Sequence, residues 1–427
     1  MKPYWSSSDH KLSIYHGDAR TVLEQLPEGS VQTCVTSPPY WGLRDYGVEG
    51  QLGLEPTPEQ YVTNMVEIFQ GVRRVLRDDG TVWLNLGDSF TSGGRDGHGT
   101  RVGYKQQTNR GMSGNNDPPR APQPPGLKPK DLCMIPARVA LALQADGWWL
   151  RSDIIWAKTN PMPESVTDRP TNSHEHIFLL AKSARYWYDA DAIREPLAEA
   201  TLQDLAQRKE PGKHDGLTKQ LGKGAGLGAG PRVSGAGRNK RNVWTVNTQP
   251  FPGAHFAVFP EKLIEPCVLA GSAARSCAEC GAAWERVVEK ERTFESGSGR
   301  SGNLPGGKNG ADLQGGGATL DIRRGPCVHT QTLGFQPTCD CEADTRPSLV
   351  LDPFGGAGTT LLCAYHQGRR AVMVELSEEY CELAAKRLEE ATDQGRLFEP
   401  AEVATAQPAQ LVMEQDAEGM AQCTLTT

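Results

Sequence analysis

A glycine-rich turn between two apolar segments is the feature that most narrows what this chain can fold into. Residues 349–352 form an apolar run typical of a buried strand, 353–358 make the turn, and a helix is predicted to start near Thr359. A second apolar strand, 370–375, follows that helix and ends in Glu375. This order predicts an α/β fold with parallel strands, in which ligands bind at the carboxyl ends of the strands.

The same unit indicates an adenosine-containing ligand. Glycine lets the backbone approach a bound molecule closely, and a carboxylate at the end of the next strand is placed to bind ribose hydroxyls. The turn is not a strict G-x-G-x-x-G sequence, and alone it is a weak signal. Glu375 has a second interpretation, as an acid at the N-terminus of the helix that follows it.

A second motif lies far upstream, in the tetrapeptide Ser37-Pro38-Pro39-Tyr40, which follows a predicted buried strand at 31–35. Two consecutive prolines fix the backbone dihedral φ and donate no N–H, which holds their carbonyls and the flanking side chains in place. A hydroxyl, a carbonyl and an aromatic ring within four residues suit a planar amine. Ser37 and Pro38 would accept the amine hydrogens, and Tyr40 would stack on the ring. An ordinary turn is the alternative.

Together these residues resemble the S-adenosylmethionine-dependent DNA methyltransferases that modify amino groups. The tetrapeptide matches the catalytic motif of that family, and residues 352–360 match its cofactor loop. The catalytic motif comes first in this chain, which is the order of the circularly permuted beta group. The resemblance extends from His10 to Leu388. It implies a seven-stranded, mostly parallel, Rossmann-like methyltransferase sheet with helices on both faces.

The resemblance also implies which residues bind the cofactor and the DNA. The cofactor positions of the family are matched by Asp18, Phe259, Lys262, Asp352, Phe354, Gly356, Gly358, Thr359 and Glu375. Capping of the next helix is an alternative role for Asp18, and Lys262 has an alternative as a surface residue. Target recognition maps to 197–250, where Arg238, Lys240 and Arg241 are the expected phosphate contacts. A solvated linker is the alternative for the glycine-rich middle of that interval.

The mechanism implied by the resemblance is direct transfer of a methyl group to the amine of a base flipped out of the duplex. Serine as the first residue of the tetrapeptide favours the N4 amine of cytosine, and the N6 amine of adenine is the alternative. Methylation of a protein glutamine uses a related tetrapeptide but places the cofactor loop upstream of it. A non-catalytic, zinc-containing DNA-binding protein is a further alternative, which the intact motifs disfavour.

Cysteine pairs predict a metal site in a small inserted, zinc-ribbon-like module at 276–342. Cys277 and Cys280, followed by glycine, have the spacing of a zinc knuckle, and Cys339 and Cys341 form a second pair. Four thiolates make a closed structural zinc site, which would hold together an insertion too rich in glycine to fold by burial alone.

Other interpretations of this segment stay open. Cys327 and His329 are alternative ligands, and Glu342 stands where a knuckle glycine is expected. Free thiols in a flexible loop would explain the same residues without a metal. The remaining division of the chain is predicted as follows: a catalytic half at 10–196 with a mobile loop at 91–130, the recognition region at 197–250, a cofactor half at 251–275 and 343–392, and a disordered tail at 393–427.

Composition limits the partners. A formal net charge of -7 argues against indiscriminate binding of polyanions, so contact with double-stranded DNA requires a local basic patch. No segment is apolar enough to span a bilayer, and the first residues lack the core of a signal peptide, which predicts a cytoplasmic protein. A homodimer and a cognate restriction enzyme are further partners that the sequence leaves open.

Overall fold

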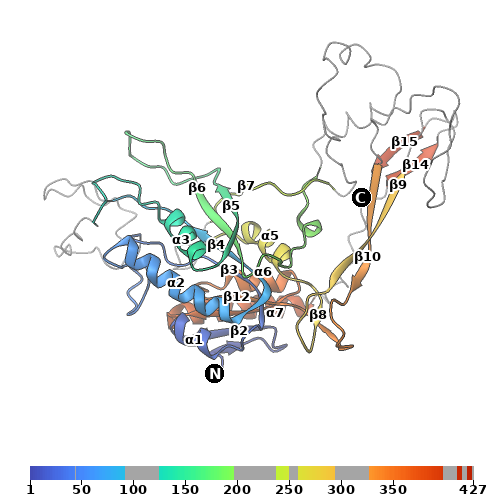
Figure 1. Ribbon diagram of the computed structural model, residues 1–427, viewed down its shortest axis with the longest axis horizontal. Coiled ribbons are helices and arrows are strands. Elements are labelled where there is room, and N and C mark those ends of the chain that lie inside the picture. Colours follow the sequence, from blue (N-terminus) through green and yellow to red (C-terminus); the bar gives the residue numbers. More distant parts are fainter. Residues whose placement is uncertain are drawn as a thin grey trace, which may run out of the picture.

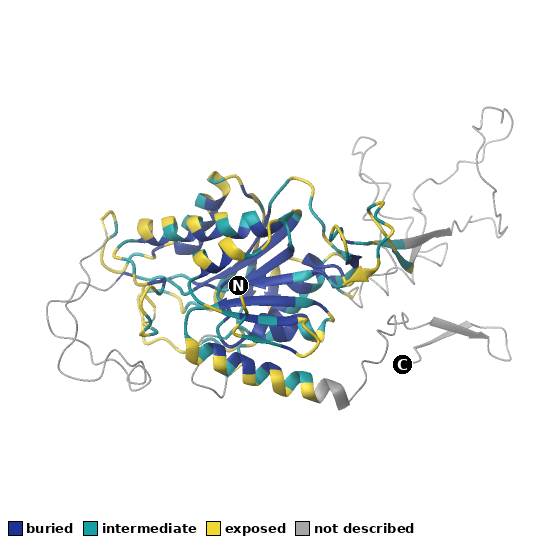
Figure 2. Cartoon of the chain, turned by 90° about the horizontal axis from the view of Figure 1, so that it is seen from below, coloured by how far each residue is buried: buried dark blue, intermediate teal, exposed yellow. Residues whose placement is uncertain are grey.

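A central sheet between two groups of helices forms the body of the protein (Figure 1). The structure is a computed structural model that describes residues 1–43, 45–91, 125–196, 237–249, 258–293 and 327–397, and two short strands near the C-terminus. Buried residues concentrate on the strands and on the inward faces of the helices (Figure 2). The predicted α/β architecture is therefore confirmed.

The sheet has nine strands in the order β1-β2-β13-β12-β3-β4-β6-β5-β7. Their bounds are β1 Trp5–Ser6, β2 Leu12–His16, β3 Val31–Thr36, β4 Leu76–Leu86, β5 Trp149–Ala157, β6 His174–Ala181, β7 Val243–Thr245, β12 Leu349–Asp352 and β13 Arg370–Glu375. The strands from β2 to β4 run parallel, and β6 is antiparallel to both of its neighbours. The seven predicted strands make up the body, and the short strands β1 and β7 extend its edges.

Strand β12 joins the two distant motifs. It comes late in the chain but lies between β13 and β3, with Val350 opposite Thr33 and Leu351 opposite Cys34 in parallel register. Because neighbouring parallel strands end at the same edge of a sheet, the glycine turn after β12 and the tetrapeptide after β3 emerge side by side. This is the permuted order expected from the sequence.

Helices cover both faces of the sheet through two hydrophobic clusters. One face packs against α1 Ala19–Gln25, α2 Pro58–Val75 and α3 Ile135–Ala145; the other packs against α5 Glu261–Gly271, α6 Thr359–His366 and α7 Glu378–Leu397. Thr57 caps the N-terminus of α2, since its hydroxyl accepts a hydrogen bond from the Gln60 N–H at 3.2 Å. No helix among the described residues is long and apolar enough to cross a membrane.

A separate hairpin extends from the body. Strands β9 Glu285–Thr293 and β10 Cys327–Gln336 pair antiparallel and lead away from the sheet (Figure 1). At the base of this hairpin the short strands β8 Ser276–Cys277 and β11 Thr345–Arg346 pair with each other. The module that interrupts the cofactor half is therefore anchored by β-pairing at both of its ends.

Two parts of the predicted organisation are only partly described. Most of the expected mobile loop at 91–130 and most of the recognition interval at 197–250 lie outside the described residues. Within the predicted disordered tail, α7 continues to Leu397 and the strands β14 Leu411–Gln415 and β15 Ala421–Leu425 pair antiparallel. The rest of that tail also lies outside the described part.

Candidate active site

A cavity of about 560 Å³ opens at the carboxyl ends of the parallel strands. Its wall includes all four residues of the tetrapeptide, Ser37 to Tyr40, and residues 352–357 of the glycine turn. A cavity of this size suits a small molecule together with a reacting group. The two motifs that the sequence separates by more than 300 positions thus share one site.

Asp352 connects the two motifs. Its buried carboxylate accepts hydrogen bonds from the Thr36 hydroxyl at 2.6 Å and from the Thr360 hydroxyl at 2.6 Å. The Phe354 N–H also donates to it, at 3.0 Å. Burial raises the pKa of Asp352, and the three hydrogen bonds act in the opposite direction. Although Asp352 lies in the wall of the cavity, its oxygens hold the end of β3 against the start of α6.

Both carboxylate oxygens of Glu375 accept hydrogen bonds from backbone N–H groups. One oxygen accepts from the Gly356 N–H at 2.7 Å and the other from the Ser377 N–H at 2.8 Å. Gly356 has a φ of +50°, a left-handed conformation that glycine adopts without strain. Burial raises the pKa of Glu375, and these two N–H groups oppose that shift. The acid therefore links the glycine turn to the segment that leads into α7, while also lining the cavity.

Most of the other predicted cofactor residues line the cavity, and two do not. Asp18, Phe259, Phe354 and Thr359 line the cavity. Asp18 also accepts from the Arg20 N–H at 2.8 Å and caps α1, so both of its expected roles are compatible with the geometry.

Gly358 and Lys262 are outside the described wall of the cavity. Gly358 has a φ of +75° and begins α6, and a Cβ placed there would lie 3.1 Å from the Cβ of Ala384. Its role is close packing of α6 against α7. Lys262 is exposed on α5, which corresponds to the surface alternative.

The hydroxyl of Tyr40 belongs to a partly buried polar network. It donates to Glu175 Oε2 at 2.7 Å, and Asn85 Nδ2 donates to the Tyr40 oxygen at 2.7 Å and to Glu175 Oε2 at 3.0 Å. Lys158 Nζ binds the other oxygen of Glu175, and the Ser37 hydroxyl donates to the Tyr40 oxygen at 3.3 Å. Burial, and then the charge of Glu175, raise the pKa of Tyr40 well above its usual value. Tyr40 therefore stays protonated and acts as a donor.

The ring of Tyr40 lies against the backbone of Gly87, just beyond β4. A Cβ added to Gly87 would sit 2.5 Å from Cε2 of that ring. No side chain larger than hydrogen fits there without moving the tyrosine. The glycine thus supports the ring, and the tyrosine remains part of the cavity wall.

The three basic residues predicted to contact DNA gather around one acid. Glu195 accepts from Arg238 Nε at 3.1 Å and lies 3.4 Å from Arg241 Nε and 4.0 Å from Lys240 Nζ. Lys240 also sits over the ring of Trp244, 5.0 Å from its centroid. Three cations around a single carboxylate leave local positive charge.

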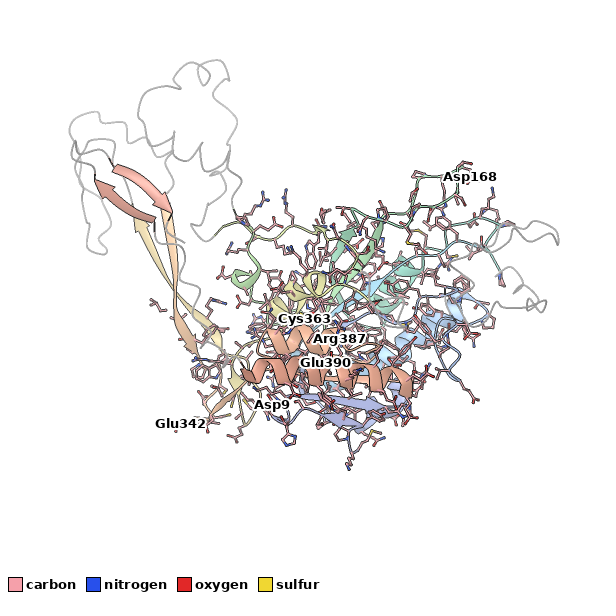
Figure 3. The ribbon with its side chains drawn as sticks, turned by 180° about the vertical axis from the view of Figure 1, so that it is seen from behind. Asp9, Asp168, Glu342, Cys363, Arg387 and Glu390 are labelled. Atoms are coloured by element: carbon pink, nitrogen blue, oxygen red, sulfur yellow. The ribbon has the colours of Figure 1, made fainter. Side chains whose placement is uncertain are left out.

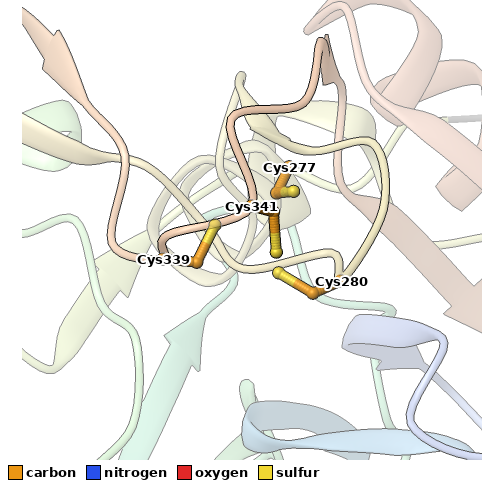
Figure 4. A group of neighbouring side chains, drawn as sticks. All are labelled: Cys277, Cys280, Cys339 and Cys341. Carbon is orange, nitrogen blue, oxygen red and sulfur yellow. The ribbon is translucent and has the colours of Figure 1, made fainter.

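The four predicted metal ligands converge in space (Figure 4). The sulfur atoms of Cys277, Cys280, Cys339 and Cys341 all lie within 4.8 Å of one another. The backbone N–H of Cys280 lowers the pKa of the Cys277 thiol to about 7, whereas hydrogen bonding with the Cys280 side chain raises that of Cys341. Zinc–sulfur bonds of about 2.3 Å in a tetrahedron place sulfurs roughly 3.8 Å apart, so the cluster fits zinc.

Backbone conformation repeats in the two halves of this cluster. Gly281 follows Cys280 with a φ of +73°, and Glu342 follows Cys341 with a φ of +49°. Glu342 therefore adopts the left-handed conformation of the knuckle glycine that it replaces, at a steric cost of roughly 1 kcal/mol. In Figure 3, Glu342 lies on the opposite side of the molecule from Asp168, which is in the connection between β5 and β6.

Glu175 is the member of the site that sequence reasoning missed. It belongs to a polar run, 174–176, at the start of the otherwise apolar strand β6. A buried strand that begins with charged residues can signal a site, but only if those residues lie at the functional edge of the sheet. They do so here because β6 runs antiparallel to β4, a direction that the sequence alone does not show.

Comparisons with known proteins identify a family model and several relatives of this chain. A family model described as DNA methylase matches residues 31–276 and 344–386. The chain is 38% identical over 378 residues to the type II methyltransferase M.Cfr9I of Citrobacter freundii, covering 88% of this chain and 87% of that protein. It is 40% identical over 378 residues to the type II methyltransferase M.XycI of Xanthomonas campestris pv. cyanopsidis, with the same coverage of 88% and 87%. Among solved structures, the cytosine-N4-specific PvuII DNA methyltransferase is 16% identical, with a TM-score of 0.47 and coverage of 92% of this chain and 93% of its own.

Proposed function

This chain belongs to the DNA methylase family, and we propose that it transfers a methyl group to the N4 amine of a cytosine flipped out of double-stranded DNA. The amino-methylating DNA methyltransferase family predicted from the sequence is confirmed. The choice of cytosine rests on Ser37 as the first residue of the tetrapeptide, and adenine N6 is the alternative outcome. The matched relatives are named type II methyltransferases, which supports a cognate restriction enzyme as a partner.

One observation carries the proposal: the amine-binding tetrapeptide and the glycine turn face the same cavity. S-adenosylmethionine, bound against the turn, would supply an electrophilic methyl group. Gly356 lets the backbone approach it closely, and Asp18 and Phe354 are proposed contacts in the wall. The fit rests on the shared cavity, whose wall includes the backbone of Gly355 and Gly356.

The chain's own residues would bind and orient the base. Ser37 Oγ and the Pro38 carbonyl accept the two amine hydrogens, which directs the nitrogen lone pair out of the base plane and stabilises the positive charge that develops on nitrogen. The aromatic ring of Tyr40, supported by Gly87, stacks on the base. Arg238, Lys240 and Arg241 are the proposed phosphate contacts that hold the duplex at the mouth of the site.

Loss of the Ser37 hydroxyl tests the site directly. Incubation of the protein with methyl-labelled S-adenosylmethionine and unmethylated DNA should place label in the DNA. We expect Ser37→Ala to lower the transfer rate about 100-fold, because one acceptor for the developing charge is removed, while cofactor binding measured by calorimetry is retained. Label found only in protein or RNA, or an unchanged rate in Ser37→Ala, would contradict the proposal.

The cysteine cluster is proposed to hold one structural zinc ion. Support comes from four thiols with the spacing of a closed site and from left-handed residues after both cysteine pairs. Arg77 Nη1 donates to the Cys280 carbonyl at 2.6 Å, which ties the knuckle to the start of β4. The ion would thus fix the base of the β9–β10 hairpin to the sheet.

A further inference from the structure

Glu175 occupies a place in the site that the two motifs do not account for. Its side chain is 14% exposed, and its two oxygens receive hydrogens from Tyr40, Asn85 and Lys158. Burial of a carboxylate is costly unless its hydrogen-bonding capacity is met. Three donors, one of them a cation, meet that requirement here. All four residues line the cavity.

The hydrogen bonds of this network determine where the hydroxyl hydrogens of Tyr40 and Ser37 point. A hydroxyl has one hydrogen to donate and two lone pairs with which to accept. Tyr40 donates its hydrogen to Glu175 at 2.7 Å, which makes the Tyr40 oxygen an acceptor for the Ser37 hydroxyl at 3.3 Å. The hydrogen of Ser37 then points toward Tyr40. Asn85 Nδ2 donates to one lone pair of Ser37 Oγ at 3.4 Å, and the other lone pair remains to accept from an amine. Donors and acceptors in such a chain polarise one another.

We propose that Glu175 is a positioning residue for methyl transfer, which acts through Tyr40 to orient the Ser37 hydroxyl and receives the proton that leaves the target amine. This inference rests on the proposed function. It gives Tyr40 two separate tasks, since the ring stacks on the base and the hydroxyl connects Ser37 to Glu175.

The step balances in atoms and electrons. The lone pair of the amine nitrogen forms the new N–CH₃ bond, and the pair of the breaking C–S bond stays on sulfur. The nitrogen then carries one positive charge and one hydrogen too many. That hydrogen passes to Ser37 Oγ, the Ser37 hydrogen passes to the Tyr40 oxygen, and the Tyr40 hydrogen passes to Glu175. The products are a neutral methylamino base and a protonated Glu175, which solvent deprotonates.

A simpler role for Glu175 is to neutralise Lys158. Lys158 Nζ also lies over the ring of Trp156, 4.5 Å from its centroid, so the ammonium already has a second favourable contact. If neutralisation were the whole role, the hydrogen bond from Tyr40 to the carboxylate would have no effect on the reaction. The two interpretations therefore predict different values of kcat for variants that lack the Glu175 carboxylate or the Tyr40 hydroxyl.

The test compares Glu175→Gln with Tyr40→Phe, with the double variant, and with Glu24→Gln as a control. Glutamine keeps the size of the side chain and one acceptor oxygen but is a poor proton acceptor, and Glu24 is an exposed acid on α1. We expect Glu175→Gln to lower kcat on the order of 100-fold, with the KM values for S-adenosylmethionine and DNA within about twofold of wild type. Glu24→Gln should match wild type in all three.

The double variant tests whether Glu175 acts through the Tyr40 hydroxyl. If Glu175 acts through the Tyr40 hydroxyl, adding Glu175→Gln to Tyr40→Phe should cause little further loss, because residues in one chain do not contribute independently. The inference is overturned if kcat of Glu175→Gln stays within twofold of wild type, if both KM values rise as far as kcat falls, or if the two losses multiply. A wild-type protein that labels no DNA would instead overturn the proposed function.

Discussion

At the scale of single residues, the site depends on small contacts behind the catalytic side chains. The position of Tyr40 is fixed from two sides, by the backbone of Gly87 against its ring and by Glu175 at its hydroxyl. A stacking ring must be held at a defined place if the amine is to face the methyl donor, because reactive geometry tolerates little displacement. The residues that do this carry no recognisable motif.

Gly87→Ala is predicted to impair the reaction without touching any reacting group. The added methyl would require Tyr40 to move, since its position lies 2.5 Å from the ring. We expect kcat to fall at least about 10-fold while S-adenosylmethionine affinity is unchanged. Gly29→Ala is the control, because Gly29 has a φ of +61° and open space around its Cβ position. It strains the backbone without reaching the site, and an equal loss of kcat in both variants would refute the explanation.

The sequence predicted the residues of the site that belong to fixed local patterns. Ser37 to Tyr40 and the glycine turn could be found because each motif lies within a few consecutive positions. Glu175 and Gly87 could not, because their roles depend on the direction of β6 and on where a ring from another segment comes to rest. The exact function of Asp352 was also out of reach, since its partners Thr36 and Thr360 are brought together only by strand pairing.

At the scale of structural elements, the hairpin formed by β9 and β10 depends on its base. At this base β8 and β11 pair with each other, and the contacts that tie it to the body include those of Arg77 with the Cys280 carbonyl, Arg286 with Asp189 and Ser276 with Ser348. A metal held by four thiolates would add a cross-link between the two chain segments. The hairpin and its attachment are therefore predicted to respond to metal removal more strongly than the sheet does.

Metal analysis and chelation test this element. Freshly purified, reduced protein should contain one zinc per chain, and Cys280→Ser should lower that content. We expect chelation to increase amide hydrogen exchange in β8, β11 and the base of the hairpin, while β3 and β12 stay protected. Protein without any metal, or unchanged exchange after chelation, would contradict the zinc proposal.

At the scale of the whole molecule, two distant parts of the chain build one sheet. The seven-stranded sheet was expected from the resemblance to a known family. The strands β3, β12 and β13 were predictable from their apolar runs, because buried strands follow a strong local pattern. The edge strands β1 and β7 were not, since two or three residues carry no periodicity. The hairpin within the inserted module was also unforeseen, because its pairing joins residues on either side of a long glycine-rich stretch.

The central proposal is that this site methylates the N4 amine of cytosine in DNA. The most direct test is mass analysis of nucleosides from unmethylated DNA that has been incubated with the protein and labelled S-adenosylmethionine. The account predicts labelled N4-methylcytosine. Labelled N6-methyladenine in its place would contradict the assignment of the base, and no labelled nucleoside from any DNA would contradict the claim as a whole.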